Sequence, residues 1–136
     1  MSSKTYINNK ISEIQKYLLK AEPYKSYTRE AIETDDTIRF SLERILFLIT
    51  QAVIDLGEMV IGYKQLRKAT TLKEVFAILH EHEIISIELC NHLMDMTGFR
   101  NVLVHDYAKI DYDRVYEVLH SGLDDIEEFI AAVEKI

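Results

Sequence analysis

The sequence contains few of the residues that interrupt helices or cross-link a chain. Its 136 residues include one proline, four glycines, one cysteine and no tryptophan. The single cysteine, Cys90, excludes an internal disulfide and is typical of a reducing cytoplasm. The scarcity of proline and glycine, without extended runs of alternating β-branched residues, favours an all-α protein. A chain of this length typically forms one domain, so we expect residues 1–136 to fold as a single unit.

Positive charge is in the minority, with 16 Lys and Arg residues against 23 Asp and Glu residues. The net charge is −7, which is unusual for a nucleic-acid-binding protein because such proteins generally carry a basic face. Binding to RNA would therefore need a local concentration of positive charge. Two short basic clusters are present, at residues 64–68 and 100–114. The first has the composition of an ordinary cationic helix C-terminus.

Long hydrophobic runs and metal-ligand sets are missing as well. The first residues lack the apolar segment of a signal peptide, and the longest apolar run, residues 45–49, is far too short to span a bilayer. We therefore expect a cytoplasmic protein that does not enter a membrane. His80 and His82 stand two residues apart and would point to different helix faces, so neither a metal nor another cofactor is predicted.

Apolar residues recur at helical spacing in five parts of the chain. The predicted helices cover residues 5–19, 37–63, 71–82 and 112–135, and a further helix begins at residue 86 and runs into the stretch 98–107. Residues 29–34 are compatible with one additional helical turn. N-cap candidates precede four of these helices: residues 35–37, Thr71 in a capping box with Glu74, Ser86, and Asp111. The expected fold class is all-α, an antiparallel bundle of four to five helices.

The second predicted helix is the most apolar. Residues 45–49 are apolar around the whole helix circumference, so they must be covered on several sides, by the bundle itself or also by a second subunit. Gly57 and Gly62 lie further along this helix. Each is compatible with close helix packing or with a glycine that is merely tolerated.

The stretch 98–107 combines a core-facing stripe with four polar side chains. The apolar positions Phe99, Val102 and Leu103 recur at helical spacing, and the polar ones are Arg100, Asn101, His105 and Tyr107. Arg100 and His105 are roughly 140° apart on an ideal helix. They would converge only if the helix loosens at His105 or if a molecule approaches from outside and touches both. An ordinary amphipathic helix end with His and Tyr at the surface explains the same pattern.

The order Arg100-Asn101-x3-His105-x-Tyr107 resembles the R-x4-H-x-Y motif of HEPN domains in the HepT-like branch. Residues 39–44 and 52–56 resemble a second block of that family, and the likeness extends over nearly the whole chain in the same order. The resemblance implies a dimeric helical bundle with a composite cleft. It also implies a ribonuclease toxin paired with a minimal nucleotidyltransferase (MNT) antitoxin that adenylylates the motif tyrosine, here Tyr107. Val102 occupies a position that is often basic in this family.

The motif residues suit metal-independent RNA cleavage. An imidazole titrates near neutral pH, so His105 is the candidate base or acid for the ribose 2′-hydroxyl reaction. The planar fork of Arg100 suits phosphate oxygens. Asn101 would hold the histidine or the substrate, and Tyr107 would donate to phosphate or orient the ring. A single chain supplies one such histidine where acid–base catalysis wants two, and a two-fold homodimer would supply both.

The sequence leaves two alternatives to a ribonuclease open. The acidic balance favours a non-catalytic HEPN module that binds nucleotide or its nucleotidyltransferase partner. A purely structural helical dimer is the third possibility, and it would leave Arg100 and His105 without a chemical role.

Overall fold

The computed structural model describes residues 2–136, with Tyr107 described by its backbone alone. The described chain is helical and contains no strand. Its α-helices are α1 (Ser3–Ala21), α2 (Arg29–Thr34), α3 (Asp36–Tyr63), α4 (Leu72–Glu81), α5 (Ile87–His105), α6 (Tyr112–Glu117) and α7 (Leu123–Glu134). Short 3₁₀ turns, η1 (Glu22–Ser26) and η2 (Tyr107–Lys109), and a π-helical turn, η3 (Val118–Gly122), connect some of them.

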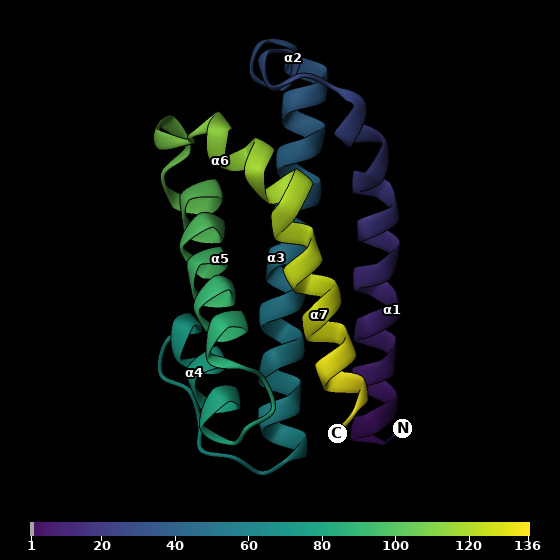
Figure 1. Ribbon diagram of the computed structural model, residues 1–136, viewed down its shortest axis with the longest axis vertical. Coiled ribbons are helices and arrows are strands. Elements are labelled where there is room, and N and C mark those ends of the chain that lie inside the picture. The colour runs from purple at the N-terminus through teal and green to yellow at the C-terminus, as the bar shows by residue number, and fades with distance from the viewer. Residues whose placement is uncertain (1) are drawn as a thin grey trace.

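Four long elements make the antiparallel bundle. In Figure 1, α1 and α5 run upward while α3 and α7 run downward, and α4 packs at the lower end. The two termini meet at that same end, where Lys4 Nζ donates to the Ile136 carbonyl at 3.1 Å. The predicted all-α antiparallel bundle is therefore confirmed.

The helix count differs from the prediction. Since α6, η3 and α7 follow one another without a break, the described chain has six helices, whereas four to five were expected. The additional helix is the short α2, which Thr28 caps by accepting from the Ala31 amide. It packs against α3 and α6. Arg29 forms an ion pair with Glu33 within α2 and another with Asp113 of α6, which connects the two helices.

The predicted N-caps are present. The side chains of Asp35, Thr71, Ser86 and Asp111 each accept a backbone N–H in the first turn of the helix that follows. Only half of the predicted capping box forms, because the Glu74 carboxylate bonds Thr70 and Arg67. Local side-chain chemistry nevertheless fixes where these helices begin.

The core contains the predicted apolar stripes. The apolar residues that recur at helical spacing in the last predicted helix, 112–135, are buried, namely Val115, Val118, Leu119, Ile126, Phe129, Ile130 and Val133. Phe129 meets Phe76 of α4 edge-to-face, with ring centroids 5.7 Å apart. Cys90 is buried and free, and burial raises the pKa of its thiol.

Helix α3 lies in the middle of the bundle and contacts four other helices: α1, α2, α4 and α5. Within its apolar segment, Leu46 and Ile49 are fully buried, whereas Ile45, Phe47 and Leu48 are only half-buried. The bundle therefore covers this segment incompletely. By length and composition α3 could cross a membrane, but 56% of its most apolar window is buried inside the protein, as in the core helix of a soluble protein.

Candidate functional site

The motif lies at the C-terminal end of α5. Phe99 and Leu103 are buried and anchor this end of the helix to the core, which leaves the polar positions to the surface. The helix stays regular up to His105, and Asp106 caps it by donating its N–H to the Val102 carbonyl. The loosening at His105 that would bring it toward Arg100 within one chain is therefore not observed.

Arg100 is half-buried and faces α3. Its Nε donates to Oε1 of Gln51 at 2.8 Å, and its NH1 donates to Oδ1 of Asn101 at 2.9 Å. Its guanidinium carbon also lies 5.8 Å from the centroid of the Phe47 ring, within the range of a cation–π contact. The structure thus brings Arg100 and Asn101 together and adds Gln51 and Phe47, two site residues that the sequence did not single out.

His105 and Asn101 are exposed at the helix end. No hydrogen bond or ion pair is recorded for His105 among the described residues, so its imidazole is available to a substrate. The side chain of Tyr107 lies outside the described part of the chain, and the roles predicted for it stay predictions.

Arg44 is a second arginine at the same place. Its guanidinium carbon lies 5.3 Å from the centroid of the Phe47 ring, so the ring contacts both arginines. The other four arginines, Arg29, Arg39, Arg67 and Arg114, all form ion pairs with carboxylates. Within the described residues, only Arg44 and Arg100 form none. Two unneutralised guanidinium groups therefore meet beside the motif of an acidic protein.

Three of the six Lys and Arg residues in the two basic clusters noted in the sequence form ion pairs. Lys109 lies 3.6 Å from Asp106, and Arg114 lies 2.6 Å from Glu117. Arg67 of the first cluster is bound by two glutamates. The local positive charge thus comes from Arg100 together with Arg44, a residue inside the block 39–44 that no sequence pattern marked as part of the site.

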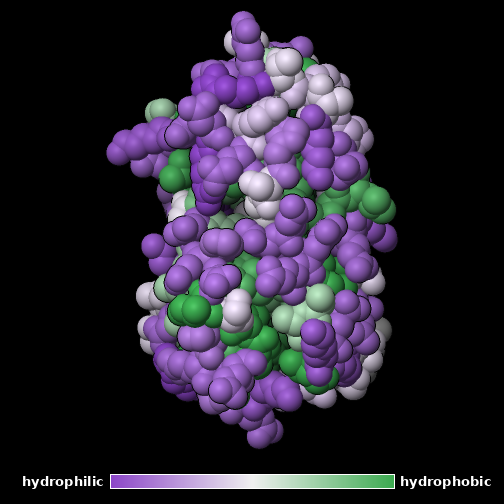
Figure 2. Space-filling view, in the orientation of Figure 1, coloured by the Kyte–Doolittle hydropathy of each residue, from purple (hydrophilic) through white to green (hydrophobic). Residues whose placement is uncertain are grey.

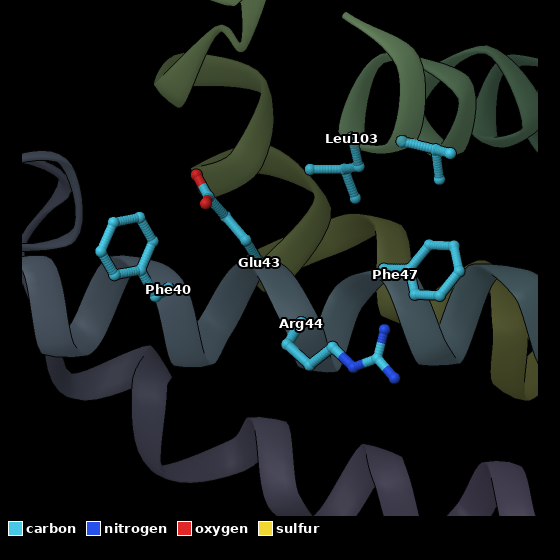
Figure 3. Close-up of a pocket in the computed structure, with 6 residues that line it drawn as sticks. Phe40, Glu43, Arg44, Phe47 and Leu103 are labelled. Carbon is cyan, nitrogen blue, oxygen red and sulfur yellow. The ribbon is translucent and has the colours of Figure 1, made fainter. Parts of the chain in front are cut away.

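A groove of about 350 Å³ adjoins the motif between α3 and α5. Figure 3 shows Phe40, Glu43 and Phe47 on the side of α3 that faces Leu103 of α5, while Arg44 brings its guanidinium toward Phe47. Phe40 is 51% exposed, and Val104, which also lines the groove, is 41% exposed. By contrast, the face seen in Figure 2 is mostly hydrophilic, with its apolar side chains in bands and patches.

Glu43 lies at this groove yet is buried, which the sequence did not predict. Its Oε2 accepts from the Tyr112 hydroxyl of α6 at 2.7 Å, which compensates part of the cost of burying a carboxylate. No group of three or more His, Cys, Asp or Glu residues in the described chain is arranged to hold a metal ion. The chemistry available here is that of a guanidinium pair, an amide and an imidazole.

Comparison with known proteins identifies the fold and the family. The structure superposes with a TM-score of 0.87 on the tri-AMPylated Shewanella oneidensis HEPN toxin in complex with MNT antitoxin, at 27% identity over 96% of this chain and 97% of that one. The fold is therefore that of a HEPN-like helical bundle. A family model described as "Ribonuclease HepT-like" matches residues 7–133, and the chain belongs to this HepT-like ribonuclease family.

Two curated relatives are similar over most of their length. The mRNA nuclease HepT of Shewanella oneidensis is 27% identical over 131 residues, which cover 94% of this chain and 96% of the relative. The tRNA nuclease HepT of Aphanizomenon flos-aquae is 28% identical over 117 residues, which cover 86% of this chain and 80% of the relative. The family expected from the motif is confirmed.

Proposed function

We propose that this chain is the toxin of a HEPN/MNT toxin–antitoxin module and cuts RNA without a metal ion, using Arg100 and His105. The observation that carries the proposal is the pair of unneutralised guanidinium groups, Arg44 and Arg100, at the end of the bundle where α5 also exposes the imidazole of His105. The guanidinium groups can bind a phosphate, and the imidazole can transfer a proton. The two relatives named mRNA nuclease and tRNA nuclease support RNA as the substrate.

The proposed reaction follows from these groups. One imidazole removes the proton of a ribose 2′-hydroxyl, and that oxygen bonds to the adjacent phosphorus. The bond from phosphorus to the 5′-oxygen breaks, and an acid protonates that oxygen, which leaves a 2′,3′-cyclic phosphate and a 5′-hydroxyl. Arg100 stabilises the charge that develops on the phosphate oxygens, and Asn101, bonded to Arg100, orients it.

The acid and the base come from two copies of the chain. Each copy supplies one His105, and a two-fold dimer places two Arg100–His105 pairs around one cleft. The exposed Phe40 and Val104, in the groove beside the motif, supply apolar surface for such a contact. The dimer also doubles the local positive charge, which explains how a protein with a net charge of −7 holds RNA.

A nucleotidyltransferase antitoxin neutralises the toxin, and Tyr107 is its target. The Shewanella oneidensis toxin is tri-AMPylated and bound to its MNT antitoxin, which supports the same partnership here. The tyrosine hydroxyl would attack the α-phosphorus of ATP and release pyrophosphate. The attached AMP adds bulk and negative charge where an RNA phosphate should lie. Both partners act in the cytoplasm, where ATP and RNA are available.

The decisive experiment is cleavage of RNA by purified protein in the presence of EDTA. Wild type should produce 2′,3′-cyclic phosphate ends, and His105→Ala should lower the rate by about 10²–10⁴-fold because it removes the acid–base group. His82→Ala, at the exposed end of α4, is the matched control and should cut like wild type. After incubation with the antitoxin and ATP, wild type should gain AMP in its intact mass, and Tyr107→Phe should not.

Cleavage by His105→Ala at the wild-type rate would rule out the proposed site. Tight binding of ATP or AMP by a wild-type protein that cuts no RNA would select a non-catalytic nucleotide-binding module, which the acidic net charge favours.

A further inference from the structure

Arg100 is the end of a chain of side-chain hydrogen bonds between α5 and α3. Asp55 Oδ1 accepts from Gln51 Nε2 at 2.9 Å, and Gln51 Oε1 accepts from Arg100 Nε at 2.8 Å. The three side chains are half-buried, so water competes for these bonds less than at an exposed site. Asn101 and the Phe47 ring complete the surroundings of the guanidinium.

We propose that Gln51 is a positioning residue for Arg100, holding its guanidinium toward the RNA phosphate without neutralising it. The other four arginines are bound by carboxylates, which fix their position and also cancel their charge. The amide oxygen of Gln51 provides the same kind of hydrogen bond and leaves the full positive charge for the substrate. With Nε and NH1 held by Gln51 and Asn101, the NH2 group has no recorded partner among the described residues and is free to bind phosphate.

Asp55 sets the direction of the Gln51 amide. A glutamine amide can present either its oxygen or its NH₂ group to a neighbour, and only the oxygen can accept from Arg100. Because the Asp55 carboxylate accepts hydrogen bonds, it holds the NH₂ group on its own side. The amide also keeps the Asp55 charge one side chain away from Arg100. This role rests on the proposed function, since it concerns how the same arginine meets RNA.

Gln51→Glu tests whether the charge that Arg100 offers to RNA depends on an uncharged acceptor at position 51. It keeps the shape of the side chain and an acceptor for Arg100. It replaces the NH₂ group that donates to Asp55 with a carboxylate oxygen, and it places a negative charge beside the Arg100 guanidinium. RNA affinity should fall about tenfold, and the slope of log affinity against log salt should become shallower by about 0.7 for each phosphate that the protein no longer neutralises. Gln15→Glu, exposed on α1, adds the same charge away from the motif and should leave that slope unchanged.

Gln51→Leu removes both hydrogen bonds and keeps most of the volume. We expect kcat/KM for RNA to fall about tenfold or more, since hydrogen bonds to charged groups are among the stronger ones in proteins. The same substitution in an Arg100→Ala background should cause no further loss of RNA binding, because Gln51 acts through Arg100. Binding is measured by fluorescence anisotropy with His105→Ala present throughout so that the RNA stays intact, and thermal unfolding verifies that each variant is folded.

Two results would overturn this role. One is a Gln51→Glu protein whose affinity and salt slope match those of Gln15→Glu. The other is a drop in binding on Gln51→Leu that is equally large with and without Arg100. If wild type cuts RNA, either result removes only the role of Gln51. If wild type neither binds nor cuts RNA, the proposed function fails and this inference fails with it.

Discussion

Arg67 and Arg100 illustrate two uses of an arginine in an acidic protein. Arg67 is bound by Glu81 and Glu74, and these hydrogen bonds raise its pKa further above its ordinary value. Its charge is cancelled, and it ties the segment before α4 to both ends of that helix. Arg100 is bound by two amide oxygens and keeps its charge. The group that accepts the hydrogen bonds, a carboxylate or an amide oxygen, therefore decides whether an arginine contributes to stability or to ligand binding.

The glutamates that bind Arg67 make stability depend on acid pH. The Thr70 hydroxyl and Arg67 hold the pKa of Glu74 below the usual value of 4.5, and Arg67 holds the pKa of Glu81 below it as well. A carboxylate with a lowered folded-state pKa contributes stability above its unfolded pKa and loses that contribution as the pH falls through the folded pKa. We expect Arg67→Gln to lower the melting temperature near neutral pH, and the difference from wild type to shrink below about pH 4.5.

Circular dichroism melts of wild type and Arg67→Gln across this pH range measure the effect. Lys68→Gln removes the same charge from a residue that has no recorded ion pair among the described residues, and it should show no such pH dependence. A difference between Arg67→Gln and wild type that stays constant with pH would contradict the prediction.

At the scale of the element, α3 determines how closely its neighbours approach. A Cβ atom at Gly57 would lie 2.6 Å from Val75 Cγ1 of α4, which is too close for a real contact. At Gly62 a Cβ would meet no atom within 4 Å. The sequence left both glycines open between close packing and simple tolerance. The structure assigns close packing to Gly57, where α4 crosses α3, and open space to Gly62.

These two glycines provide a matched pair of variants. Gly57→Ala should destabilise the protein by about 1–3 kcal/mol because Val75 or α4 must shift to admit the methyl group. Gly62→Ala should be neutral or stabilise by at most about 1 kcal/mol, since alanine is the better helix former. Urea unfolding measures both values. Equal effects at the two positions would show that α4 does not approach α3 this closely at Gly57.

At the scale of the whole molecule, the antiparallel bundle gathers the site from two helices. Arg100 on α5 meets Gln51, Phe47 and Arg44, which lie on α3, and the groove between these helices remains partly apolar. The partly apolar groove that one chain leaves uncovered therefore adjoins the motif, which supplies only one histidine per chain. This arrangement supports a dimer built around the motif.

Phe40→Asp tests the dimer. A charge at this exposed groove residue should convert a wild-type dimer to a monomer in sedimentation experiments. It should also lower the rate of RNA cleavage at least about tenfold at the same protein concentration. A monomer contains only one His105 and therefore lacks one member of the acid–base pair. Leu19→Asp places the same charge at a residue that is 74% exposed on α1, away from the groove, and should change neither property. A Phe40→Asp protein that remains dimeric would move the interface elsewhere.

Much of the fold could be predicted because it depends on local chemistry. The caps at Thr71, Ser86 and Asp111 act within one helical turn, so a few neighbouring residues contain the information. The buried face of the last helix follows from spacing alone. The π-helical turn at Val118–Gly122 was missed because the same apolar spacing also fits a regular helix.

The sequence by itself determined the long helices, the starts of four helices and the motif residues Arg100, Asn101, His105 and Tyr107, since each depends on side chains a few positions apart. Only the tertiary structure decided what surrounds them. Gln51 lies 49 positions from Arg100, and no periodicity in the chain predicts that the two will bond. The burial of Glu43 under the Tyr112 hydroxyl, and the pairing of Arg44 and Arg100 through one aromatic ring, likewise arise when separate helices pack together. Contacts between distant segments depend on the shapes and charges of both partners, and these partners meet only where the helices pack into the bundle.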